Sequence, residues 1–228
     1  MRLLCASLIL GVGVAHAGSL SGKLELPPPP DRPPVATRGF LDRVENPLTP
    51  VKPVNIAPYL LVVLDGEAPA PESSISVNWE LVGESFAKPI IGVPVGAEVV
   101  IKNTSKTARL LVAKEDAQLV GGGPVNPGGP KSFRTKEVKN YTLTDAEAPH
   151  LKGKVVVVQT THIANVDDTG KFEIAEMPAG NYKLRIYYFN PSSGKDGWLD
   201  RPDDAVVIPA KGKAEVTAKV PTGFPLKK

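Results

Sequence analysis

The sequence predicts an all-β protein, either a single β-sandwich or a pair of them. Three observations favour this class. Pro and Gly are frequent, at 24 and 21 of 228 residues, and each Pro removes a helix donor and clashes with the preceding turn. Apolar residues show no sustained 3.6-residue period. Instead, short alternating segments stand between Gly, Pro, Asn and Asp, as in antiparallel β proteins.

The N-terminal segment 1–17 has the features of a secretory signal peptide. Arg2 supplies a positive start, residues 3–14 are apolar or small, and Ala15 and Ala17 occupy the −3 and −1 positions of a cleavage site. We expect cleavage after Ala17 and a periplasmic or secreted mature protein. A buried N-terminal strand is the alternative. No later stretch reaches the length of a membrane span, so no transmembrane segment is expected.

Beyond this segment the sequence predicts short strands in close succession. The first covers residues 22–26, where polar and apolar residues alternate. Further strands are predicted at 59–65, 74–82, 97–103, 109–114, 138–143, 153–160, 172–174, 181–189, 205–208 and 214–220.

Four regions follow from this order. They are the signal peptide 1–17, a first strand with a Pro-rich insert at 18–58, one β domain at 59–150 and a second β-sandwich at 151–228.

The Pro-rich insert stands apart from the strands in composition. Of the 24 prolines, 10 fall between Pro27 and Pro58, and residues 27–30 are all Pro. Consecutive prolines cannot join a β-ladder and favour an extended, semi-rigid polyproline geometry. The insert is either a spacer or a docking ligand for the groove of a partner protein.

A motif near the C-terminus explains how the second sandwich packs. Residues 167–184 read D-D-T-G-K-F-E-I-A-E-M-P-A-G-N-Y-K-L. We expect Gly170 to form a hairpin turn, because Gly tolerates positive φ. The alternating apolar positions then share one core face: Phe172, Ile174, Tyr182 and Leu184. This motif resembles the repeat core of carboxypeptidase regulatory-like, transthyretin-like domains, with Met177 in place of the common Val.

Two upstream segments carry a second resemblance. Residues 18–24 read G-S-L-S-G-K-L, and residues 86–103 read F-A-K-P-I-I-G-V-P-V-G-A-E-V-V-I-K-N. Their order is similar to that of bacterial exported cupredoxin-like proteins, often labelled methylamine-utilisation proteins. The resemblance implies a Greek-key cupredoxin-like sandwich for residues 59–150.

The copper ligands that this resemblance implies are missing. Copper-binding members carry a His shortly after the final Asn of the second segment, then Cys, His and Met near the last strand. Here residues 104–111 contain no His, only His150 remains near the later ligands, and the single Cys, Cys5, lies in the expected signal peptide. Because a blue-copper site needs a thiolate and two imidazoles, the sequence excludes it. We expect no cofactor.

Weaker metal sites remain as alternatives. His150 and His162 could form a two-imidazole site if the chain between them reverses, although two surface or satisfied histidines are the simpler interpretation. Asp167, Asp168 and the acidic residues of 196–204 have ligand chemistry for hard cations. None of them follows a known calcium-loop spacing, and turn formation explains them more simply.

Four residues are candidates for partner binding. Trp198 lies in a polar stretch beside Lys195 and Arg201, and Trp and Arg dominate interface hot spots. Alternatively, the Trp198 ring folds over a sheet edge. The run 187–189 places rings on both faces of a strand, so we expect one face to offer a stacking surface, with Tyr188 as its aromatic residue.

The function that these features favour is non-catalytic. No zinc motif, nucleophile elbow, phosphate-binding loop or dinucleotide fingerprint is present. A net charge of +3, spread along the chain, gives no electrostatic basis for nucleic-acid binding. We expect a binding or scaffolding protein of the cell envelope that acts through protein–protein contacts. The alternatives are a carbohydrate- or cell-wall-binding module and a weak copper or divalent metal carrier.

Overall fold

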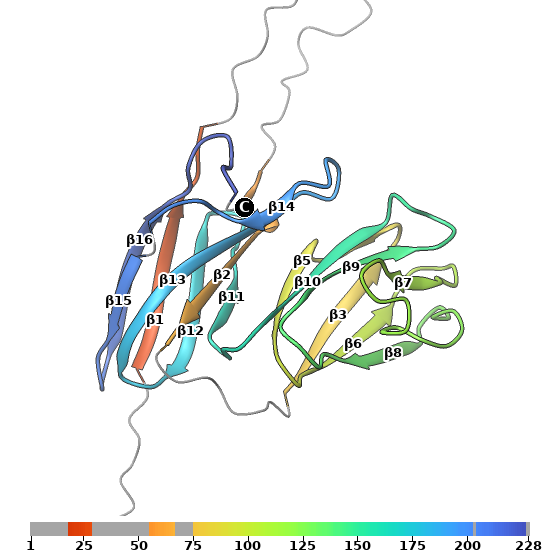
Figure 1. Cartoon of the computed structure of the whole chain (residues 1–228), viewed down its shortest axis with the longest axis horizontal. Coiled ribbons are helices and arrows are strands. Elements are labelled where there is room, and N and C mark those ends of the chain that lie inside the picture. The colour runs from red at the N-terminus through yellow and green to blue at the C-terminus, as the bar shows by residue number, and fades with distance from the viewer. Residues whose placement is uncertain (1–17, 29–54, 67–74, 203, 227–228) are drawn as a thin grey trace, which may run out of the picture.

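The computed structural model describes residues 18–28, 55–66, 75–202 and 204–226 (Figure 1). The expected signal peptide, 1–17, and most of the Pro-rich insert lie outside the described residues. Within those ranges the only helix is a single 3-10 turn, η2 (Ala57–Tyr59), and all other regular elements are strands. The all-β prediction is confirmed. No helix among the described residues is long and apolar enough to span a membrane.

The strands form two lobes of two sheets each. In the first lobe, sheet A has the order β12-β1-β16, and sheet B has the order β11-β2-β13-β14, with β15 also paired to β13 (Figure 1). Sheet A comprises β1 (Gly18–Glu25), β12 (Lys171–Met177) and β16 (Lys213–Lys219). Sheet B comprises β2 (Leu60–Asp65), β11 (Ile163–Asn165), β13 (Gly180–Phe189), β14 (Asp196–Trp198) and β15 (Asp204–Ile208).

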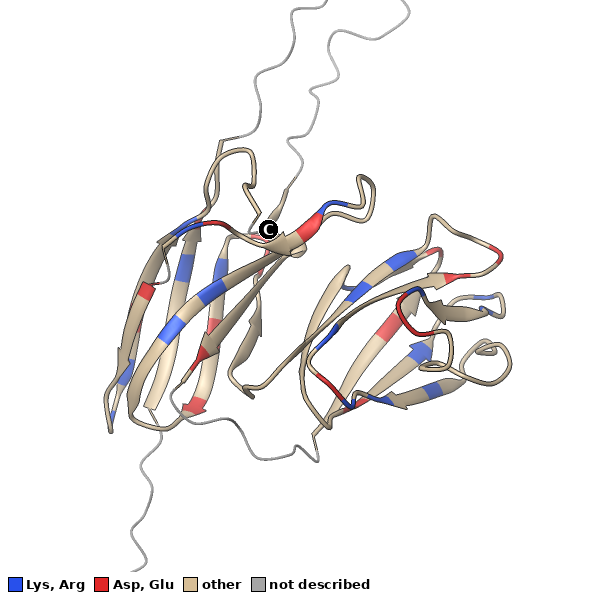
Figure 2. Ribbon diagram, viewed as in Figure 1, with Lys and Arg blue, Asp and Glu red and all other residues tan. Residues whose placement is uncertain are grey.

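The second lobe is built in the same way. Sheet C has the order β4-β3-β6-β8, and sheet D has the order β5-β10-β9-β7. Sheet C comprises β3 (Ser76–Val82), β4 (Ser85–Phe86), β6 (Glu98–Asn103) and β8 (Pro130–Arg134). Sheet D comprises β5 (Ile90–Pro94), β7 (Leu111–Ala113), β9 (Asn140–Asp145) and β10 (Lys152–Val158). Acidic and basic residues are interspersed over both lobes in the view of Figure 2.

The expected domain boundaries at 58/59 and 150/151 need correction. β2 belongs to the lobe of the C-terminal strands, because it pairs antiparallel with both β13 and β11. β10 belongs to the other lobe, because it pairs with β5 and β9. From β1 onward the described chain therefore starts in the first lobe, forms the second lobe with β3 to β10, and returns to the first lobe with β11. Hydrogen bonding between strands distant in sequence decides this order, and a reading along the sequence does not reveal it.

The motif of residues 167–184 packs as predicted. Gly170 has φ +83, and a Cβ there would lie 2.6 Å from the carbonyl oxygen of Leu24. Asp167 Oδ1 fixes the turn by accepting hydrogen bonds from the backbone N–H groups of Thr169 and Lys171, both at 2.8 Å. The four apolar positions are buried in one cluster between sheets A and B: Phe172, Ile174, Tyr182 and Leu184.

Three apolar layers hold the four sheets together. One lies between sheets A and B and another between sheets C and D. The third lies between the lobes, where sheet B faces sheet D. Alternation along β2 shows the division, because Leu60 and Val62 face the first lobe's core whereas Leu61 and Val63 face the second lobe. We call this third layer the interlobe core: Leu61, Val63, Ile90, Val156, Val158, Tyr187 and Phe189, with Ile163 and Trp198 at its margin.

Truncating the interlobe core should destabilise the whole molecule. Leu61 is 0% exposed, and Leu→Ala at a buried site costs about 2–5 kcal/mol. We therefore expect Leu61→Ala to lower the free energy of unfolding by that amount while the protein still unfolds in a single transition. Chemical denaturation followed by circular dichroism measures both.

Val82→Ala is the matched control, since Val82 is 50% exposed on the second lobe, and it should change the free energy of unfolding by less than about 0.5 kcal/mol. Two separate transitions in the unaltered protein would show that the lobes are not coupled.

Candidate functional site

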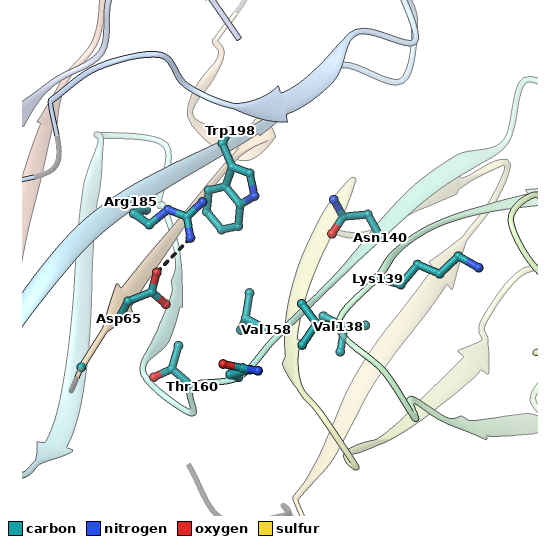
Figure 3. Close-up of a pocket in the computed structure, with 11 residues that line it drawn as sticks. Asp65, Val138, Lys139, Asn140, Val158, Thr160, Arg185 and Trp198 are labelled. Atoms are coloured by element: carbon teal, nitrogen blue, oxygen red, sulfur yellow. Dashed lines mark hydrogen bonds and ion pairs between the residues drawn. The ribbon is translucent and has the colours of Figure 1, made fainter. Parts of the chain in front are cut away.

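A cavity of about 520 Å³ opens between the two lobes at one side of the interlobe core (Figure 3). We call it the interlobe cleft. Sheet B contributes Asp65, Arg185 and Trp198 to its wall. The start of β9 and the two residues before it contribute Val138, Lys139 and Asn140. The end of β10 and the residues that follow it complete the lining.

The first-lobe wall is an ordered stack of side chains. The guanidinium carbon of Arg185 lies 4.0 Å from the centroid of the Trp198 ring, and Arg185 Nη1 lies 2.9 Å from Asp65 Oδ2. Tyr187 meets the Trp198 ring edge-on, with centroids 5.1 Å apart. The strand geometry explains this arrangement. Trp198 is the cross-strand partner of Tyr187, and Arg185 precedes Tyr187 by two residues on the same face of β13.

A network of hydrogen bonds joins the lobes beside this stack. Lys154 Nζ from the second lobe lies 2.7 Å from Asp196 Oδ2 of the first lobe and donates to Thr142 Oγ1 at 2.9 Å. Tyr187 Oη donates to the same Asp196 oxygen at 2.7 Å and accepts from Asn140 Nδ2 at 3.2 Å. Burial, and then the hydrogen bond to Asp196, raises the pKa of Tyr187 far above its ordinary value. Tyr187 is therefore a permanent donor, and the network fixes the width of the cleft.

Trp198 is the one predicted partner-binding residue that lines the cleft. It lies on strand β14 and is half-buried, whereas the sequence placed it in a polar loop. Lys195 is exposed and donates through Nζ to the carbonyl oxygen of Gly223 at 3.0 Å. The side chain of Arg201 is 10% exposed and pairs with Asp204. Neither Lys195 nor Arg201 is among the residues that line the cleft.

The expected stacking surface at Tyr188 is absent, and this prediction was wrong. Tyr188 is 5% exposed, and its ring stacks on Phe224 with centroids 4.4 Å apart. One face of β13 is covered by sheet A, and Tyr188 points into that core. The opposite face, with Tyr187 and Phe189, is covered by the second lobe. The prediction requires one solvent-facing side of β13, and along this stretch both sides are covered.

The two-imidazole site is also excluded by the topology. His150 precedes β10 and His162 follows it, so a seven-residue strand separates them, which is roughly 20 Å at about 3.3 Å per residue. His150 Nε2 lies 3.5 Å from Glu84 Oε2 at the surface, and His162 packs edge-on against Tyr182. Among the described residues, no three His, Cys, Asp or Glu side chains gather in a way that could hold a metal ion.

Copper-binding cupredoxin-like proteins carry a ligand His shortly after the Asn that corresponds to Asn103. In this chain that region contains other side chains. Arg109 lies within the stretch 104–111, and its Nη1 is 3.2 Å from Asp145 Oδ2, with side chains 11% and 1% exposed. The Asn103 amide donates to the carbonyl oxygens of Thr107 and Val125, both at 2.8 Å. A guanidinium, a carboxylate it neutralises and a satisfied amide do not fit a copper ion that requires thiolate and imidazole ligands.

Comparisons with known proteins concern the fold. No family model and no curated protein matches the chain. A reduced amicyanin mutant is 19% identical with a TM-score of 0.34, over 42% of this chain and 98% of that one. An oxidised amicyanin mutant is 21% identical with a TM-score of 0.32, over the same shares. A purple cupredoxin from Nitrosopumilus maritimus is 18% identical with a TM-score of 0.34, over 36% of this chain and 99% of that one.

Sequence patterns do not single out the other residues that line the cleft. Val138 and Lys139 begin a predicted strand, and Arg185 alternates with apolar residues along another. Such residues are ordinarily read as solvent-facing. A signal existed in residues 60–64, which are all Leu or Val, because a continuous apolar run indicates a strand buried on both faces.

The Lys154–Asp196 ion pair should contribute measurably to stability. The Lys154 side chain is 6% exposed and that of Asp196 is 30% exposed, so we expect Lys154→Met to cost about 1–3 kcal/mol, below the 3–5 of a fully buried pair. A double-mutant cycle with Asp196→Asn should give a coupling energy above about 0.5 kcal/mol.

The surface pair of Lys213 and Glu173, with side chains 46% and 64% exposed, is the control and should couple more weakly. Equal coupling in the two cycles would contradict a structural role for the interlobe pair.

His162 should make stability depend on pH. Burial lowers the pKa of His162 below its ordinary 6.5, so the folded state favours the neutral imidazole. The contribution of the neutral His162 imidazole to the free energy of unfolding is complete above pH 6.5. It is lost as the pH falls through the pKa of His162 in the folded state. We expect His162→Phe, which keeps a ring beside Tyr182, to lose less stability between pH 7.5 and 5.5 than the unaltered chain.

Denaturant unfolding of the variant and of the unaltered chain at about these two pH values measures the stability that each loses. His150→Phe, which changes a surface histidine, is the control and should follow the unaltered chain. An unchanged pH dependence in His162→Phe would refute the assignment.

Proposed function

We propose that the protein is a non-catalytic binding and scaffolding protein of the cell envelope that acts through protein–protein contacts, with the interlobe cleft as its contact site. Export is supported by the positive start, apolar run and small-residue cleavage pattern of residues 1–17. A partner in the periplasm or outside the cell fits that pattern. This proposal extends to the full chain, including the Pro-rich insert as a second contact.

The Trp198–Arg185 stack is the observation that carries the proposal. Trp and Arg are the residues most enriched at interface hot spots, and hot spots occupy pockets that exclude water. Trp198 is half-buried at the cleft, and across it Val138 exposes 56% of its surface. A large apolar side chain that is exposed beside an aromatic anchor gains free energy when a partner covers it.

The chemistry of the cleft favours binding over catalysis. The one carboxylate in its described lining, Asp65, is held by Arg185 at 2.9 Å. His150 and His162 lie outside this lining, so the cleft has no imidazole to activate a nucleophile. What its wall offers is an aromatic ring, apolar surface and hydrogen-bonding groups whose positions the neighbouring sheets fix.

The test is a cross-linked pull-down of the tagged protein from its native envelope. We expect Trp198→Ala to reduce recovery of a stoichiometric partner by tenfold or more, because truncating a Trp hot spot costs about 2 kcal/mol or more. Val207→Ala, at a site that is 68% exposed on the first lobe, is the control and should leave recovery unchanged. Shortening the Pro-rich insert tests the second contact.

Three outcomes would overturn this proposal. Equal recovery with Trp198→Ala and Val207→Ala would remove the cleft from the interface. Binding to purified glycans that requires Trp198, with no protein partner recovered, would identify a carbohydrate-binding module. A copper stoichiometry that falls in a His150→Ala and His162→Ala double variant would point to a metal carrier, although the two side chains do not meet.

A further inference from the structure

We infer that the interlobe cleft recognises an extended segment of its protein partner that carries an acidic side chain next to an apolar one. This inference rests on the proposed function and adds the chemistry of the partner. It follows from the size of the cleft, the charges of its wall and the fixed position of Arg185.

The size of the cleft restricts what can enter. A volume of about 520 Å³ lies within the roughly 300–1,000 Å³ of pockets that enclose small ligands. A folded domain, which contributes about 800 Å² of surface to a stable interface, cannot enter such a space. A few residues of extended chain can, and their side chains then alternate between the two walls.

The charges of the lining favour an acidic side chain. Arg185 and Lys139 are its cations and Asp65 is its anion, which gives a formal net charge of +1. Asp65 binds Nη1 of Arg185, and among the described residues Nε and Nη2 of that side chain have no hydrogen-bond partner. A carboxylate of the partner can accept hydrogen bonds from this unoccupied edge of the guanidinium, in the bidentate geometry that Arg provides.

The second cation of the lining, Lys139, comes from the opposite wall, and its side chain points away from the space that Arg185 faces (Figure 3). Its Nζ lies 3.7 Å from Glu137 Oε1 and donates a long, 3.4 Å hydrogen bond to the carbonyl oxygen of Glu115. The side chains of Lys139 and Glu137 are 41% and 66% exposed. Lys139 Nζ also lies 5.7 Å from the centroid of the Tyr141 ring, so Arg185 is the cation that faces the cleft and carries the acidic preference.

Apolar surface lies beside Arg185. Trp198, Val138 and Val158 contribute to the same lining, and Figure 3 shows these side chains around the space that Arg185 faces. The partner segment therefore needs an apolar residue beside its acidic one. Because the Trp198 ring already stacks on Arg185 and Asp65 holds the guanidinium, the site is formed before the partner binds, which lowers the entropic cost of association.

The test is selection from a random seven-residue peptide library displayed on phage, with the immobilised full chain as bait. We expect enriched peptides to contain Asp or Glu next to an apolar residue. Replacing that acid by its amide in a synthetic peptide should weaken binding about tenfold or more, as expected for a hydrogen bond to a charged group. Trp198 fluorescence reports binding, since Trp79 is 1% exposed.

Variants of Arg185 test whether this side chain causes the preference for an acidic peptide. Arg185→Gln should bind the acidic peptide and its amide equally. Arg185→Lys should keep part of the preference for the acidic peptide, because it keeps the positive charge but loses the bidentate geometry of the guanidinium. Lys102→Gln, an exposed cation on β6 of the second lobe, is the control and should behave as the unaltered chain. Thermal unfolding of each variant shows that the fold is intact.

Three results would overturn the inference: enriched peptides without an acidic residue, an acidic preference that survives Arg185→Gln, or no enrichment at all. Glycan-array binding that depends on Trp198 would also overturn it, in favour of a carbohydrate. The inference and the proposed function fail separately. A protein partner that needs Trp198 but shows no acidic preference would leave the proposed function standing.

Discussion

The structure depends on the burial of sheets B and D on both faces. In a simple antiparallel sandwich each sheet has one solvent-exposed face. Here the alternate residues of β2 and β10 enter two different apolar layers, so Leu61 and Val156 lie as deeply as Leu60 and Val155. The interlobe core therefore joins the two lobes as packed β-layers, without a disulfide. The relative position of the lobes, and with it the cleft, follows from this burial.

The cleft forms where this apolar layer ends and polar side chains make the contacts between the lobes. Across the gap between the lobes, Lys154 pairs with Asp196 and Asn140 donates to Tyr187. On another part of the interface, Asn165 Nδ2 donates to the carbonyl oxygen of Ile90 at 2.9 Å. Directional contacts of this kind fix the register between the lobes, which non-directional apolar packing leaves less defined. Trp198 and Arg185 lie on the rigid first-lobe wall and present a preformed surface.

Much of the fold could be predicted from local patterns, but of the residues that line the cleft only Trp198 could. The turn at Gly170 and the packing of Phe172 and Tyr182 follow from a motif in which each position has a local role. Each predicted strand is found, whereas sequence patterns do not predict β4, β5, β8, β11 and β14. Most of these have two or three residues, too few for an alternation to show. Arg185 and Val138 line the same cleft only because the two lobes pack against each other. No local sequence pattern predicts how the lobes pack.

Site-specific photocrosslinking tests the central claim most directly. Benzoylphenylalanine in place of Val138 positions a reactive group at the mouth of the cleft, and the same residue in place of Val207 positions it on the first lobe away from the cleft lining. After irradiation in the native envelope, the account predicts a discrete protein adduct from position 138 and none from position 207. No adduct at 138, or the same adduct from both positions, would contradict it.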